Sequence, residues 1–206
     1  MDTRQREVAD VSEAVPLMYS AGPESFRYVF SVDYENQALD FLRYAFCTGK
    51  GEFGYMGHQV AIKDGKIVGL VGRRSAKENT LYTVAAIKQI LKFYPLTKAL
   101  GVLIRGLRFE AIVKPPIKNV ICLHNLAVSA EQQGAGIGQE IIENFIKKEQ
   151  RQGTLVIGLN VAETNPRAKA LYERLGFVVK GKSIGRLKSK YGRGVSHEYM
   201  EINISH

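Results

Sequence analysis

Glycine occupies every second position of the segment 134–138, which lies between an apolar run and an amphipathic stretch. The apolar run, residues 120–128, predicts a strand, and the amphipathic stretch, residues 139–150, predicts a helix. Glycine lets a backbone approach a ligand closely, and the first turn of a helix presents unpaired N–H groups at the positive end of its dipole. A strand, a glycine turn and a helix in this order can hold a phosphate group, although a tight turn without a ligand has the same pattern.

The spacing of these glycines does not fit the two best-known nucleotide-binding loops. A dinucleotide fingerprint follows its strand directly, whereas residues 129–132 separate the strand from the glycines here. The nearest acidic residue at a strand end, Glu163, also lies too far along the chain. No Gly-Lys-Ser/Thr closes the segment, so it is not a P-loop. The turn therefore predicts a phosphate-bearing ligand of another kind.

Length and composition favour a single soluble domain, residues 1–206, and a cytoplasmic protein. The N-terminus has no signal-peptide pattern, no apolar run is long enough to span a membrane, and Cys47 and Cys122 form no disulfide or metal pattern. We therefore expect no transmembrane segment and no metal. The formal charge of +9 attracts polyanions such as a phosphorylated cofactor, an anionic membrane or nucleic acid, and it equally serves solubility. We expect no nucleic-acid partner, because no recognised motif is present.

The remaining patterns place the glycine turn in a mixed α/β sheet. Asp64-Gly65 between two apolar runs predicts a hairpin. Pro95 divides a helical pattern between residues 80 and 113 into two helices. The other expected strands are 3–8, 155–161, 177–179 and 197–204, and the other expected helices begin at Asp10 and span 34–46 and 165–175. Strands that form a hairpin first and then alternate with helices predict a mixed sheet.

A second motif follows one helix and one strand after the glycine turn. It reads Asn-x-x-Ala-x-x-x-Tyr-x-x-x-Gly-Phe from Asn165, and it places Ala168 and Tyr172 on one face of a predicted helix. On its own, Tyr172 is as readily explained as a half-buried core residue with its hydroxyl at the surface. The order of the two motifs carries more information than either of them.

Together the two motifs resemble the GNAT superfamily of N-acetyltransferases. The similarity covers residues 120–180 well, and the hairpin and N-terminal elements more loosely. It implies an acyl-CoA N-acyltransferase fold, with a mostly antiparallel twisted sheet flanked by helices and a helical insertion at about 80–113. It also implies acetyl-CoA as co-substrate. The cofactor-binding positions that it implies are Leu126, Ala127, Val128, Gln133, Gly134, Ala135, Gly136, Ile137, Gly138, Asn160, Asn165 and Ala168.

The resemblance also implies the catalytic residues. Tyr172 matches the family's frequent general acid, and a tyrosine of pKa about 10 can protonate a leaving thiolate. Many members carry a Glu base on the strand before the turn, but this strand carries His124 and Cys122 instead. His124 is the candidate general base, with a water relay or a purely structural histidine as alternatives. Cys122 fits a small core residue better than an acyl-carrying nucleophile.

Two segments depart from the family pattern. The first, 80–113, is basic and apolar, and it can form a helical pair on the sheet, a wall of the acceptor pocket, a homodimer surface, or a face for a membrane or an acidic partner. The second, 180–194, is basic and glycine-rich, and it predicts a long mobile loop near the acceptor.

We expect an enzyme that transfers acetyl groups from acetyl-CoA directly to the primary amine of a small molecule or a peptide. A non-catalytic CoA-binding or sensory module is the alternative from another class, and an adaptor that binds through the basic segment is a third.

Overall fold

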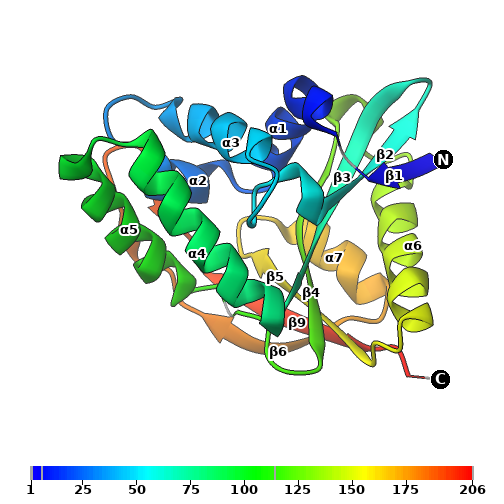
Figure 1. Cartoon of the computed structure of the whole chain (residues 1–206). Coiled ribbons are helices and arrows are strands. Elements are labelled where there is room, and N and C mark those ends of the chain that lie inside the picture. Colours follow the sequence, from blue (N-terminus) through cyan, green and yellow to red (C-terminus); the bar gives the residue numbers. More distant parts are fainter. Residues whose placement is uncertain (1, 6, 114, 206) are drawn as a thin grey trace.

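The centre of the computed structural model, which describes residues 2–5, 7–113 and 115–205, is a seven-stranded sheet with the order β1-β2-β3-β4-β5-β9-β6 (Figure 1). Among the described strand pairs of this sheet, β4 and β5 run parallel and the others run antiparallel. The strands are β1 (Asp2–Gln5), β2 (His58–Lys63), β3 (Lys66–Ser75), β4 (Val120–Val128), β5 (Val156–Ala162), β6 (Val178–Ser183) and β9 (His197–Asn203). The mixed, mostly antiparallel sheet predicted from the sequence is confirmed.

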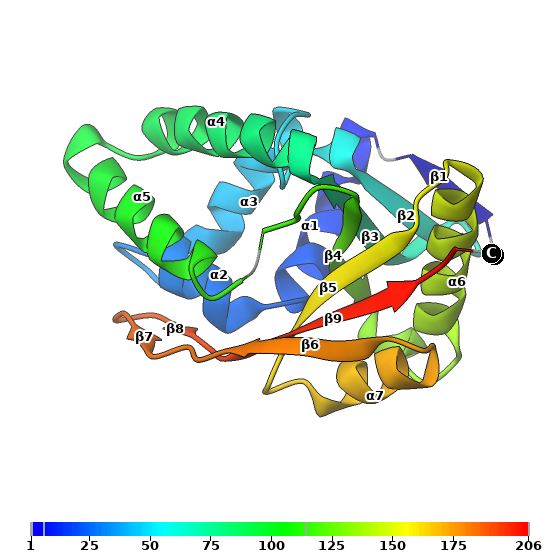
Figure 2. The ribbon, with the colours of Figure 1, turned by 90° about the horizontal axis from the view of Figure 1, so that it is seen from below.

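Helices cover both faces of this sheet (Figures 1 and 2). Ile141 and Phe145 of α6 pack with Leu123 of β4 in one core, and the first three helices form a second core with Leu70 of β3 and Ala127 of β4. Helices α6 and α7 therefore lie on one face, and the N-terminal helices lie on the other. The helices are α1 (Val11–Ser20), α2 (Pro23–Phe30), α3 (Gln37–Cys47), α4 (Ala76–Phe93), α5 (Leu96–Glu110), α6 (Ile137–Arg151) and α7 (Pro166–Arg174).

The N-terminal elements follow the prediction in part. Helix α1 ends at Ser20, so the break that Ala21-Gly22-Pro23 predicts in this helix is confirmed. The helix α2, which starts at Pro23, was not predicted; proline fits the first helical turn, where its missing N–H costs nothing. Pro16, which the sequence allows to kink or shorten this helix, lies inside α1 (Val11–Ser20). Of the strand expected at 3–8, residues 3–5 belong to β1 and Arg6 lies outside the described residues, whereas Val8 begins a short 3-10 helix.

The insertion between β3 and β4 is the predicted pair of helices, divided at Pro95. Helix α4 begins with a capping box, in which Ser75 accepts from the Glu78 N–H and Glu78 accepts from the Ser75 N–H. Helix α5 contacts α2 and helix α4 contacts α3, so the pair packs against the N-terminal helices.

The basic segment 180–194 contains more regular structure than expected. Its first residues continue β6 to Ser183, and β7 (Leu187–Lys188) pairs with β8 (Arg193–Gly194) in a small hairpin. Tyr191 at its turn donates a hydrogen bond to the Asp33 carbonyl. The segment expected to be a long mobile loop therefore contains the end of a strand and a small hairpin.

Candidate active site

The two parallel strands at the centre of the sheet separate along their length. Residues 120–123 of β4 pair with residues 156–159 of β5, and the described pairing ends there. Beyond that point β4 continues beside β3, with Val128 opposite Gly69, and β5 continues beside β9. On the side of β4 that faces β5, main-chain groups of Leu126, Ala127 and Val128 therefore have no partner strand among the described strands. The same is true of β5 from Asn160 onward, on its side that faces β4. We call this unpaired region the gap.

An irregular residue, Asn125, lies at the point of separation. Its φ of 50° is in the left-handed region, and the β3–β4 register shifts there, with two residues of β4 opposite Val71. The Asn125 Nδ2 atom lies 3.1 Å from His58 Nε2, and His58 Nδ1 lies 3.0 Å from the Gly54 carbonyl oxygen. Because a carbonyl only accepts, His58 Nδ1 donates and Nε2 accepts from Asn125. This buried histidine therefore holds the bulge.

The glycine turn follows β4 through a short 3-10 helix, Ala130–Gln132. Gly134 and Gly136 have φ values of 90° and 81°, which other residues adopt only at a cost, and Gly136 is the N-cap of α6. No side chain caps α6 within the described residues. Its first N–H groups are therefore free of a side-chain partner, as a diphosphate site requires, and the turn fits such a group.

Arg167, which the sequence reasoning missed, lies beside this turn. Its Nη1 donates to Gln133 Oε1 at 3.1 Å, and a Cβ built on Gly134 would lie 3.5 Å from its Nη2. A guanidinium is suited to a phosphate because it presents several donors in one plane. The sequence could have suggested Arg167 only through its position in the second motif, directly after Asn165-Pro166.

The second motif forms α7, on the same face of the sheet as the glycine turn. Asn165 caps this helix, because its Oδ1 accepts from the Ala168 N–H at 3.1 Å. Tyr172 is buried in the core beneath α6 and α7, with its ring centroid 5.9 Å from that of Phe177. Burial raises the pKa of Tyr172 above its ordinary value, so the hydroxyl keeps its proton at physiological pH.

His124 lies on the opposite face of the sheet. It is paired with Gly72, and a Cβ on that glycine would lie 2.5 Å from its ring, so the glycine makes room for the imidazole. Both ring nitrogens are covered and have no hydrogen-bond partner. Burial, helped by the charge of Arg74, lowers the pKa of His124 from its usual value, so the ring is neutral at pH 7.

Cys122 lies two residues before His124 on that face. Burial raises the pKa of its thiol to about 11, which leaves almost no thiolate at neutral pH. A small buried core residue explains Cys122 better than a nucleophile does.

Asn160 also projects toward this face, because its neighbours Leu159 and Val161 lie in the core beneath α6 and α7. The structure thus brings the turn and Tyr172 to one side of the gap, and His124 and Asn160 to the other.

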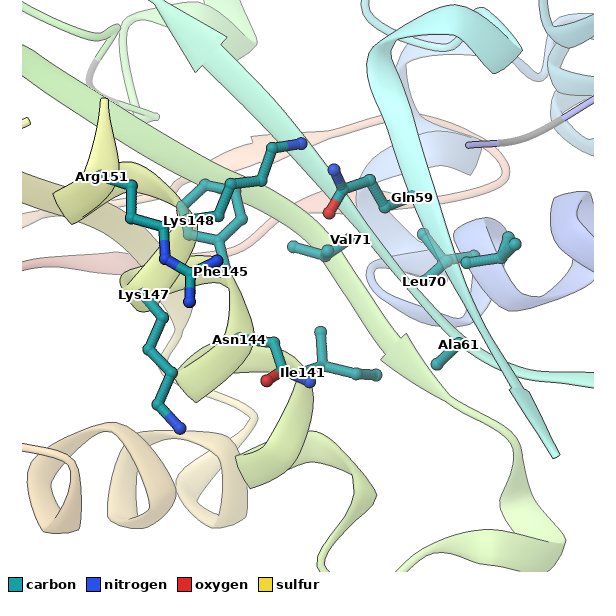
Figure 3. Close-up of a pocket in the computed structure, with 11 residues that line it drawn as sticks. Gln59, Ala61, Leu70, Val71, Ile141, Asn144, Phe145, Lys147, Lys148 and Arg151 are labelled. Carbon is teal, nitrogen blue, oxygen red and sulfur yellow. The ribbon is translucent and has the colours of Figure 1, made fainter. Parts of the chain in front are cut away.

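A separate groove lies between α6 and the strands β2 and β3 (Figure 3). Lys147, Lys148 and Arg151 line one side of it, and Gln59 and Val71 lie on the other. None of the predicted site residues lines this groove. Among the described residues, no group of three or more His, Cys, Asp and Glu side chains could hold a metal ion.

Comparison with known proteins finds a match to the Acetyltransferase (GNAT) family over residues 18–177. An L-methionine sulfoximine/L-methionine sulfone acetyltransferase of Pseudomonas aeruginosa is 27% identical over 81 residues, which are 39% of this chain and 46% of that protein. A [Ribosomal protein bS18]-alanine N-acetyltransferase of Escherichia coli is 38% identical over 55 residues, 27% of this chain and 37% of that protein. The matched region therefore spans less than half of these curated relatives.

Solved structures resemble the whole chain. An N-acetyltransferase from Staphylococcus aureus Mu50 superposes with a TM-score of 0.74 at 16% identity, over 98% of this chain and 100% of that one. A second acetyltransferase structure gives a TM-score of 0.69 at 18% identity, over 100% of both chains. At these identities the likeness shows the fold, including the sheet and its flanking helices.

Proposed function

The chain belongs to the GNAT family of acetyltransferases, and from this premise we propose that it is an acetyl-CoA-dependent N-acetyltransferase acting on a primary amine. The observation that carries the proposal is the continuity of the site. Strand β4, which separates from β5 beyond Leu123, is followed after one short 3-10 helix by a glycine turn with uncapped N–H groups.

Acetyl-CoA fits this arrangement in two parts. The N–H groups of the turn 133–138, together with Arg167, would hold its diphosphate. Main-chain groups of Leu126, Ala127 and Val128 would hold the pantetheine arm by hydrogen bonds of the kind that strands exchange. Asn165 and Ala168 are proposed neighbours of the cofactor at the start of α7, where they already bond to each other. When bound, the group supplies an acetyl thioester and departs as a thiol.

The proposed acid and base lie on opposite faces of the sheet, so the proposal requires the thioester and the amine to meet where β4 and β5 are unpaired. An acceptor amine must lose a proton to become a nucleophile, because its pKa of about 10.4 keeps it charged at neutral pH. His124 is neutral, so the ring nitrogen that carries no proton would take the proton once the amine or a water reaches it. A water relay to His124 serves the same purpose over a longer distance.

Tyr172 would act on the cofactor side of the gap. Its raised pKa keeps the hydroxyl protonated, so it can donate a hydrogen bond to a sulfur that gains negative charge, and then its proton. The phenol recovers its proton from solvent. The relatives named above acetylate an amino acid analogue and a protein alanine, which supports a small-molecule or peptide amine as the acceptor class.

A thiol-release assay with acetyl-CoA over a panel of amines and peptides tests the proposal. Tyr172→Phe should lower kcat more than it raises KM, because the hydroxyl acts on the departing sulfur. Tyr94→Phe is the matched control, since Tyr94 is a buried tyrosine whose hydroxyl bonds to the Phe30 carbonyl, away from the turn. Calorimetric binding of acetyl-CoA without thiol release for any amine would indicate a binding module. Absence of both binding and release would reject the proposal.

A further inference from the structure

The outward face of the helical pair α4–α5 is the largest group of exposed apolar side chains in the part of the chain that the structure describes. Half of the sixteen large exposed apolar residues lie on these two helices, so they are concentrated rather than scattered. Their exposure ranges from 40% for Ile87 to 77% for Leu96. They are Leu81, Val84, Ile87, Leu91, Leu96, Leu100, Ile104 and Leu107.

These residues form one stripe on each helix. Successive members on each helix are three or four residues apart, which keeps them on one side of the helix. The residues that the helices bury, Ile90 on α4 and Val102 on α5, belong to the core shared with α1–α3. The exposed stripes therefore play no part in holding the helices to the domain.

The charges on the same two helices are divided by side. Both acidic residues face β3: Glu78 binds Arg73 at 2.8 Å and Glu110 binds Arg74 at 3.3 Å. Two cations also have partners in the domain, because Lys98 binds Asp33 and Arg105 donates to the Ser31 carbonyl. Four exposed cations remain with the apolar stripes: Lys77, Lys88, Lys92 and Arg108.

We propose that the face formed by these eight apolar residues and four cations docks on an anionic lipid surface. A bilayer with anionic headgroups offers both the apolar interior and the negative charge that this face lacks. A second copy of the chain would bring the same four cations against themselves, so the charge pattern opposes self-association. Among the described residues no helix is long and apolar enough to cross a membrane, so the pair would lie on the surface.

The position of this face leaves the proposed cofactor site open. The helical pair lies on one side of the sheet, and α6 with its glycine turn lies on the other (Figures 1 and 2). A membrane beneath α4 and α5 would therefore not cover residues 133–138. The inference does not depend on the proposed function, because binding to lipid requires neither acetyl-CoA nor an amine.

Cosedimentation of the 206-residue chain with lipid vesicles tests the proposal. Vesicles of phosphatidylcholine mixed with phosphatidylglycerol should bind the chain, and vesicles of phosphatidylcholine alone should bind it far more weakly. Replacing Lys88 and Lys92 with alanine should weaken binding about fivefold per cation removed. Leu96→Gln and Leu100→Gln should each weaken it by roughly tenfold.

Matched variants elsewhere on the surface distinguish this face from general stickiness. Lys147→Ala with Lys148→Ala removes two cations from α6, and Leu155→Gln removes a side chain that is 56% exposed. Neither control should change vesicle binding. Equal binding to both vesicle types, or full binding by the leucine variants, would overturn the proposal. A dimer that Leu100→Gln dissociates, without vesicle binding, would assign the face to a second copy instead.

Discussion

Replacement of Asn125 tests whether its side-chain hydrogen bond and its left-handed backbone both stabilise the bulge in β4. Two variants separate the contributions. Asn125→Gly keeps a residue that tolerates the φ of 50° but removes the donor to His58. Asn125→Ala removes the donor and also places a Cβ in the left-handed region.

The magnitudes follow from the burial of His58, which is 2% exposed. Each variant loses the hydrogen bond from Asn125 to this buried ring, which costs about 0.5–1.5 kcal/mol. Alanine adds about 1–2 kcal/mol for the left-handed conformation. Glycine adds about 0.5–1 kcal/mol, because it increases the entropy of the unfolded chain. The alanine variant should therefore be the less stable of the two by about 0.5–1 kcal/mol.

Urea unfolding followed by circular dichroism measures both free energies, since the chain has no tryptophan to report by fluorescence. Asn119 is the matched control: its φ is 67°, it is exposed, and no side-chain hydrogen bond holds it to a histidine. There the histidine contribution is absent, so glycine should cost only about 0.5–1 kcal/mol and alanine about 1–2 kcal/mol. If Asn125→Gly is as stable as the unaltered chain, His58 does not hold the bulge. If Asn125→Ala is the more stable variant, the reasoning about backbone strain is wrong.

Three further predictions concern the cofactor turn and His124. Gly136→Ala should weaken acetyl-CoA binding in calorimetry by about tenfold, because alanine resists the φ of 81° that aims the first N–H groups of α6. Arg167→Ala should weaken it at least tenfold, while Arg174→Ala on the same helix should not; equal losses would mean that Arg167 acts only through α7. His124→Phe should flatten the pH dependence of stability. The folded-state pKa of His124 is lowered, so the unfolded chain binds more protons and the unaltered chain loses stability as pH falls below about 6.5. Urea midpoints at about pH 7.5 and about pH 5.5 measure this, and an unchanged difference would count against a buried neutral imidazole.

The elements around the two motifs were predictable because their signals are local. The apolar run at 120–128 forms β4 over the predicted residues, and the glycine turn leads into α6 as expected. Pro95 divides α4 from α5 because the residue before a proline disfavours the helical conformation, and Tyr94 is extended. The helix α2 was missed because Gly22-Pro23 has the composition of a chain break, although proline is equally suited to a first turn.

The parts of the candidate site that escaped prediction join distant segments. His58 and Asn125 are 67 residues apart, and no periodic pattern links a histidine on β2 to a bulge on β4. Arg167 reaches Gln133 across 34 residues. The sequence could not show that His124 and Tyr172 lie on opposite faces of the sheet. Alternation along one strand shows which residues share a face, but the sheet topology is needed to know which helices cover that face.

In the proposed enzyme the separation of β4 from β5 would have a kinetic consequence. The turn 133–138 and Tyr172 lie on one face of the sheet, and His124 and Asn160 project toward the other. A donor and an acceptor that load from opposite sides do not compete for one entrance, so neither has to leave before the other arrives. Initial-rate plots against both reactants should then intersect, as they do for ternary-complex enzymes, rather than run parallel.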